Sequence, residues 1–120
     1  SSQDAFSRLE TMVMMASQNI PDKVIRQMLA SAVNIVVHCA RLNDGTRKVV
    51  AISEVAGVEG HTVDMHDIFL FERTGVSPRG HVLGKFLATG TRPHCLDRLK
   101  SYGITLSHSI FNEVREVKER

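Results

Sequence analysis

The sequence predicts an α+β fold in which two helices come first, several antiparallel strands follow, and short helices come last. Three observations support this order. Apolar residues recur at helical spacing over the first 32 residues, short apolar runs alternate with glycine-containing turns from residue 35 to residue 87, and a helical pattern returns after Pro93. Helices segregated from antiparallel strands are typical of the α+β class. At 120 residues the chain is one small domain or part of a larger one.

The first helix is expected from about residue 2 to residue 17, with Ser2 as its N-cap. Its apolar face comprises Ala5, Phe6, Leu9, Met12, Val13 and Ala16. Pro21 suits the first turn of a second helix, because proline lacks the N–H that a first turn leaves unbonded. The buried face expected for this second helix comprises Val24, Ile25, Met28, Leu29 and Ala32.

Residues 35–40 form a continuous apolar run rich in β-branched side chains. Such a run without a polar face predicts a strand that is buried on both sides, and we expect it to be the deepest element. Asn43, Asp44 and Gly45 supply hairpin-turn chemistry, since these residues tolerate positive φ. The returning strand is expected over residues 48–55.

Gly57 and Gly60 are expected to bracket the next turn, before a third strand over residues 62–71. A polar loop over residues 74–80 leads to a fourth strand over residues 81–87, where Gly84 suits a bulge. Arg92-Pro93 begins a third helix that ends at Gly103, and Ser107 caps a last helical turn through Phe111. From about residue 112 we expect a flexible tail.

The composition excludes several classes of protein. Apolar residues make up 42% of the chain, and a net charge of +2 arises from acidic and basic residues that are interleaved along the sequence. Nucleic-acid binding favours dense basic clusters, so no nucleic-acid partner is expected. The two cysteines have no CxxC spacing, which favours a reducing, cytoplasmic setting. No apolar run approaches the roughly 20 residues that span a bilayer.

Neither a metal site nor a nucleophilic site is predicted. His38-Cys39 and His94-Cys95 are adjacent pairs, and neighbouring side chains on a strand point to opposite faces. We expect His38 and Cys39 to lie in the core and the other histidines mostly on surface loops. Arg92 and a helix start could activate the Cys95 thiol, but no other catalytic signature accompanies it.

The chain also lacks a recognisable phosphate-binding loop. The glycines at 75, 80, 84 and 90 form neither GxxxxGK[ST] nor GxGxxG. Without a phosphate cradle and a metal-binding acid, phosphoryl transfer lacks its electrostatic clamp, so this chain is not expected to be an enzyme by itself. Among the scattered arginines, Arg8 lies on a predicted helix. It is either a surface partner of Asp4 or Glu10, or a donor to a phosphate or an acidic partner group.

Several segments, in order, resemble a known family. The segments DAFSRLETMV from Asp4, IRQMLASA from Ile25, RLNDG from Arg41, SEV from Ser53, EG from Glu59 and DIF from Asp67 are similar to the region after the histidine box in type II/IV secretion ATPases. The segments TGTRP from Thr89 and LDRL from Leu96 are similar to the terminal region of the CpaF-like subgroup, which serves tight-adherence (Flp) pili. The resemblance runs from the first helix to about Phe111.

The resemblance implies a RecA-like P-loop ATPase parent, of which this chain is the C-terminal part. Such a parent binds ATP and Mg, forms a homohexamer on the cytoplasmic face of the inner membrane and contacts a platform protein there. Its Walker A, Walker B and histidine boxes would precede Ser1, so no catalytic residue carries over. Arg8 and Arg26 match arginines of the family pattern, which makes them candidates for a nucleotide-proximal or subunit-interface role.

Two other classes remain as alternatives, a stand-alone protein-interaction module without a catalytic role and a nucleic-acid-binding domain. The interleaved charges disfavour the second. If the chain is a fragment, its helices and apolar strand lack their packing partners. Exposed strand edges and apolar patches favour association, so we expect a dimer or a higher oligomer.

Overall fold

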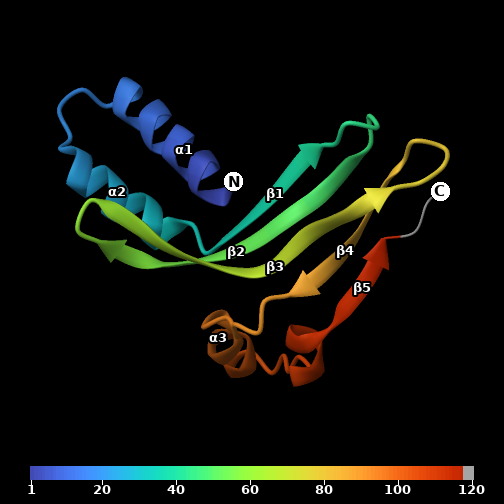
Figure 1. The fold of residues 1–120 in the computed structure, drawn as a ribbon. Coiled ribbons are helices and arrows are strands. Elements are labelled where there is room, and N and C mark those ends of the chain that lie inside the picture. Colours follow the sequence, from blue (N-terminus) through green and yellow to red (C-terminus); the bar gives the residue numbers. More distant parts are fainter. Residues whose placement is uncertain (118–120) are drawn as a thin grey trace.

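A computed structural model describes residues 1–117 and confirms the α+β class (Figure 1). The elements, in chain order, are α1 (Ser2–Ala16), α2 (Asp22–Ala32), β1 (Ile35–Arg41), β2 (Arg47–Glu59), β3 (Thr62–Val76), β4 (Val82–Ala88), α3 (Cys95–Ser101), the 3-10 helix η1 (His108–Asn112) and β5 (Val114–Val117). The strands form one antiparallel sheet in the order β1-β2-β3-β4-β5. Helices α1 and α2 lie on one face, while α3 and η1 lie on the other.

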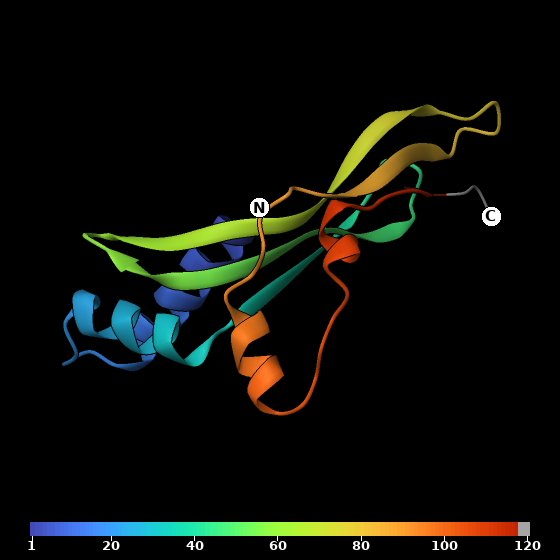
Figure 2. The same ribbon diagram turned by 90° about the horizontal axis from the view of Figure 1, so that it is seen from below.

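The sheet is long and twisted, and it has two distinct ends (Figure 2). At the helical end, α1, α2 and the β2–β3 turn at Gly60 lie together. At the hairpin end, the β1–β2 turn (42–46) lies beside the β3–β4 turn (77–81). The Asp44 carboxylate joins these two turns, since it accepts a 2.7 Å hydrogen bond from the Val82 N–H.

The molecule is more open than a typical domain of its length. Its radius of gyration is 17.1 Å, against about 14 Å for a compact domain of this length. Its accessible surface is 8394 Å², against about 6,500 Å² for a compact monomer of this mass. The buried apolar side chains among residues 1–117 are few: Phe6, Ile25, Ala51, Val63, Ile68, Val82, Pro93 and Phe111.

The predicted helices are present, but their apolar faces are only partly covered. On α1 only Phe6 of the predicted face is buried, and Met12 is 63% exposed. On α2 only Ile25 is buried, and Met28 is 58% exposed. Both caps lie one position earlier than predicted: Ser1 caps α1 in a capping box with Asp4, and Pro21 is the N-cap of α2. The helices therefore expose apolar surface that the sequence pattern assigned to a core.

The prediction that residues 35–40 form the deepest strand is wrong. β1 is an edge strand with no fully buried residue, and Val37 is 54% exposed. His38 is half-buried and Cys39 is exposed, so the expected core position of this pair is also wrong. A continuous apolar run is buried on both faces only when other elements cover both, and the described residues leave β1 largely uncovered.

The strands are longer than predicted, because bulges allow them to continue through the glycines. Gly57 has φ 149 and lies in β2 at a register shift, so only Gly60, with φ 61, makes the second turn. β3 continues to Val76, with its own shift between Arg73 and Gly75 rather than a bulge at Gly84. Gly84 is needed for another reason, since a Cβ there would lie 2.3 Å from the Phe71 ring.

The C-terminal elements agree with the prediction up to Phe111. Helix α3 follows Pro93, and the Ser107 hydroxyl caps η1 by accepting a hydrogen bond from the Ser109 N–H. Phe111 packs under the sheet beside Phe69, whose ring also stacks on Phe86 at 5.9 Å. The expected tail from about residue 112 instead contains β5, which pairs with β4, and the rest of that tail lies outside the described residues.

Candidate functional site

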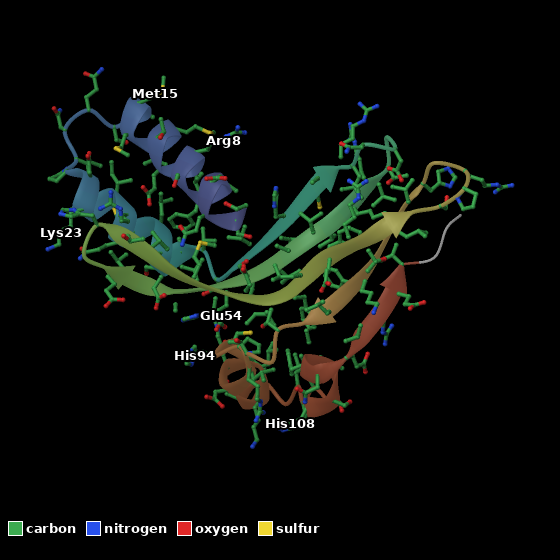
Figure 3. All side chains as sticks on the ribbon, in the orientation of Figure 1. Arg8, Met15, Lys23, Glu54, His94 and His108 are labelled. Carbon is green, nitrogen blue, oxygen red and sulfur yellow. The ribbon has the colours of Figure 1, made fainter. Side chains whose placement is uncertain are left out.

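An apolar groove between α1 and the edge strand β1 is the best candidate for a binding surface. Its volume is 320 Å³, and its lining residues are Ala5, Phe6, Arg8, Leu9, Met12, Val33 and Val36. We call it the α1–β1 groove. The exposed Arg8 gives this otherwise apolar lining one positive charge (Figure 3).

The open edge of β1 lies beside this groove. In the described sheet β1 pairs on one side only, with β2. The outer edge of an antiparallel strand presents unpaired N–H and C=O groups, and these are ready to pair with another strand. An apolar groove next to an open strand edge can bind a protein segment.

The two arginines singled out from the sequence lie in different environments. Arg8 makes no ion pair with any described residue, so neither Asp4 nor Glu10 holds it in a salt bridge. Arg26 is mostly buried, and its Nε lies 3.5 Å from Glu10 Oε1. That Nε makes no well-aligned hydrogen bond, although the ion pair compensates its charge. Arg26 therefore ties α2 to α1, and only Arg8 is free to meet a partner.

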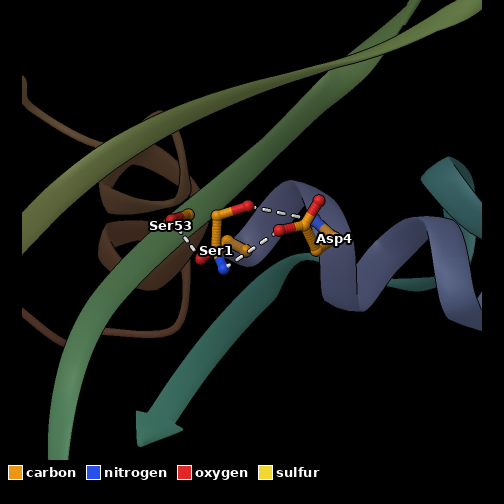
Figure 4. A network of polar contacts seen from close by, with 4 residues as sticks. Ser1, Asp4 and Ser53 are labelled. Atoms are coloured by element: carbon orange, nitrogen blue, oxygen red, sulfur yellow. Dashed lines mark hydrogen bonds and ion pairs between the residues drawn. The ribbon is translucent and has the colours of Figure 1, made fainter.

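A second polar cluster fixes the start of α1 on the sheet. The Ser53 hydroxyl is fully buried, and it lies 2.9 Å from the Ser2 hydroxyl (Figure 4). It also lies 2.6 Å from Asp67 Oδ1. A hydroxyl has one proton and a carboxylate can only accept, so Ser53 donates to Asp67 and accepts from Ser2. This cluster orients the helix that forms one wall of the α1–β1 groove.

A third cluster, on the opposite face, holds α3. Glu54 is only 4% exposed, and its carboxylate accepts hydrogen bonds from the backbone N–H groups of His94 and Cys95. No residue of α3 is fully buried, so these two bonds are its main described attachment to the sheet. Glu54 was not among the site residues predicted from the sequence, although a lone carboxylate inside the apolar stretch of β2 was the available signal.

The surroundings of Cys95 argue against a nucleophilic role. Burial raises the pKa of its thiol, and the neighbouring Glu54 charge raises that pKa further. A reactive cysteine requires the opposite setting, with nearby positive charge that favours the thiolate. In residues 1–117, no three His, Cys, Asp or Glu side chains are grouped closely enough to hold a metal ion.

Another hollow lies at the hairpin end, with a volume of 740 Å³. Phe71, Phe86, Val82 and Val117 provide apolar lining, while Arg47 and Lys48 add positive charge. The Asp44 carboxylate also lines it, but this group is already bonded to Thr46 and Val82. We call this cavity the hairpin-end hollow.

The comparisons with known proteins do not assign the chain to a family. Neither the models of protein families nor the curated proteins give a match. In the described part of the chain, no helix is both long enough and apolar enough to cross a membrane.

Proposed function

We propose that this chain is the C-terminal part of a hexameric secretion or Flp-pilus ATPase, and that its role there is structural. The α1–β1 groove docks the chain onto the nucleotide-binding part of the same protein. The parent binds ATP and Mg in a RecA-like core and works at the cytoplasmic face of the inner membrane. This proposal rests on the ordered resemblance of the sequence segments, and one structural observation supports the docking role.

That observation is the uncovered state of β1. Its apolar run has the composition of a central strand, yet its outer edge is open and Val37 is exposed. The excess surface of the molecule, about 1,900 Å² over a compact monomer, exceeds what one partner buries in a standard interface, about 800 Å². A covering element that pairs with β1 and fills the α1–β1 groove would remove both anomalies.

Arg8 has a specific place in this arrangement. It is an exposed cation at the α1–β1 groove and has no ion-pair partner among the described residues. A guanidinium at the rim of an interface can donate to a carboxylate or to a phosphate of the docked part. Arg26 supports the groove only indirectly, through Glu10 on α1.

The proposal is tested by binding between this chain and the protein part encoded directly upstream in the same reading frame. Met12→Lys should weaken binding at least tenfold, because it places a charge in the α1–β1 groove. Met15→Lys is the matched control, since Met15 lies one turn further along α1, is 76% exposed and does not line the groove. Equal effects of the two substitutions, or no binding by the wild type, would refute the docking role.

A further inference from the structure

The fold separates charges that the sequence interleaves. The helical half of the molecule (residues 1–34 and 54–67) has three cationic side chains and seven carboxylates, a net charge of −4: Arg8, Lys23, Arg26, Asp4, Glu10, Asp22, Glu54, Glu59, Asp64 and Asp67. The hairpin half (residues 35–53 and 68–91) has six cations and two carboxylates, a net charge of +4: Arg41, Arg47, Lys48, Arg73, Arg79, Lys85, Asp44 and Glu72. These two halves therefore carry opposite net charges, and the remaining described residues, 92–117, carry a net charge of +1.

Apolar surface accompanies each charged end. At the helical end, Val24 is 41% exposed and Met28 is 58% exposed, and they lie one turn apart on α2. Asp22, in the first turn of the same helix, and Glu59, at the end of the neighbouring strand β2, supply negative charge, and the exposed Lys23 beside Asp22 offsets part of it. This set of two apolar and two acidic side chains forms what we call the helical-end ridge.

The hairpin-end hollow has the complementary chemistry. Phe71 and Phe86 offer aromatic surface, against which methionine packs favourably. Arg47 and Lys48 supply positive charge at the same hollow. Among the described residues that line it, Asp44 is the one carboxylate, and it accepts hydrogen bonds from Thr46 and Val82.

We propose that two copies of this chain associate head to tail, with the helical-end ridge of one copy in the hairpin-end hollow of the next. The two surfaces lie at opposite ends of each molecule, so the contact is heterologous and leaves one free surface of each kind for further copies. Opposite charges at the two ends favour this orientation, and like charges disfavour contact between two identical ends. The inference does not depend on the proposed function.

Two charge-reversed proteins test this contact. Arg47→Glu/Lys48→Glu makes the hollow negative, and Asp22→Lys/Glu59→Lys makes the ridge positive. Each variant alone then carries the same sign at both contact surfaces and should stay monomeric in sedimentation and light scattering. An equimolar mixture should associate again, because the two variants together restore opposite charges at the contact.

The wild-type protein should associate at about 50 mM salt and lose at least tenfold in affinity at about 500 mM, because screening shortens the range of the attraction. Arg92→Glu/Lys100→Glu is the matched control: it reverses two exposed charges near α3, outside both surfaces, and should associate like the wild type. Circular dichroism should show wild-type secondary structure for every variant. If the hollow variant fails to fold, Arg47→Gln/Lys48→Gln replaces it and should weaken association.

Three results would overturn the proposal. The first is a wild-type chain that stays monomeric at low salt and high concentration. The second is a charge-reversed variant that associates by itself as tightly as the wild type, which would indicate pairing through the open β1 edge instead. The third is a mixture of the two folded variants that remains monomeric.

Discussion

Glu54 on β2 and Cys95 on α3 are 41 residues apart in sequence, and a 2.8 Å hydrogen bond joins the Glu54 carboxylate to the Cys95 N–H. The other oxygen of the same carboxylate accepts from the His94 N–H at 2.7 Å. One buried side chain thus accepts hydrogen bonds from two N–H groups at the start of α3. No residue of α3 is itself fully buried, so these two bonds hold the start of the helix on the sheet.

Glu54→Gln should destabilise the protein by about 1–3 kcal/mol, because the amide replaces one acceptor oxygen with an NH₂ group and leaves one of two part-buried N–H groups unpaired. Urea denaturation measures this change. Glu72→Gln is the matched control, since Glu72 is exposed on β3 and its substitution should leave the stability unchanged within about 0.5 kcal/mol. Equal stability of Glu54→Gln and the wild type would contradict the anchoring role.

The Cys95 thiol should react slowly with iodoacetamide at neutral pH, because its raised pKa leaves little thiolate. In a Cys39→Ser background Cys95 is the only thiol, and its reaction should be slower than that of Cys39 in a Cys95→Ser background. Adding Glu54→Gln should accelerate the Cys95 reaction, since the substitution removes the charge that disfavours the thiolate. A fast reaction of Cys95 in the folded wild type would revive the nucleophile hypothesis.

Asp44 makes the stability of the hairpin end depend on pH. Hydrogen bonds from the Thr46 hydroxyl, then from the Val82 and Thr46 N–H groups, lower the pKa of Asp44 from 3.8 to about 2. A lowered pKa stabilises the folded state above the ordinary pKa, and this contribution is lost as the pH falls from about 4 to about 2.

Asp44→Asn should therefore be less stable than the wild type at pH 7. The difference between the two proteins should shrink as the pH falls from about 4 to about 2, as measured by thermal unfolding across that range. A difference that stays constant down to pH 2 would show that the Asp44 charge does not join the two turns.

Gly84→Ala should destabilise the sheet by about 1–3 kcal/mol, because the added Cβ meets the Phe71 ring at 2.3 Å and the Glu72 carbonyl oxygen at 2.6 Å. Gly75→Ala is a matched control on the neighbouring strand, where a Cβ has no atom within 4 Å and φ is not positive. Comparable denaturation midpoints for both variants would mean that Phe71 does not lie over Gly84 in solution.

Features that depend on neighbouring residues were predictable from the sequence, and features that depend on distant residues were not. The turn at Gly45 and the cap at Ser107 depend on neighbouring residues alone, and both were predicted correctly. Whether β1 is central or at an edge depends on what lies beside it, so its apolar run was misleading. β5 has only four residues, two of them charged, which is too short for a recognisable strand pattern.

The candidate binding surfaces also depend on residues that are far apart in the sequence, so they could not be predicted from it. Arg8 was identified because it stands on a predicted helix, but the α1–β1 groove needs Val36 from a strand 28 residues further on. The separation of charge was invisible along the chain, because only the folded hairpins bring Arg47 and Arg79 to one end. Glu54 acts through residues some 40 positions away, so its role required the structure.

The most direct test of the account is the sequence of the reading frame immediately upstream of Ser1. If the chain is the docking part of a secretion ATPase, that same reading frame should encode a GxxxxGK[ST] loop and a histidine-containing segment. A reading frame that begins near Ser1, or one that extends upstream without a phosphate-binding loop, would contradict the account and favour a stand-alone interaction module.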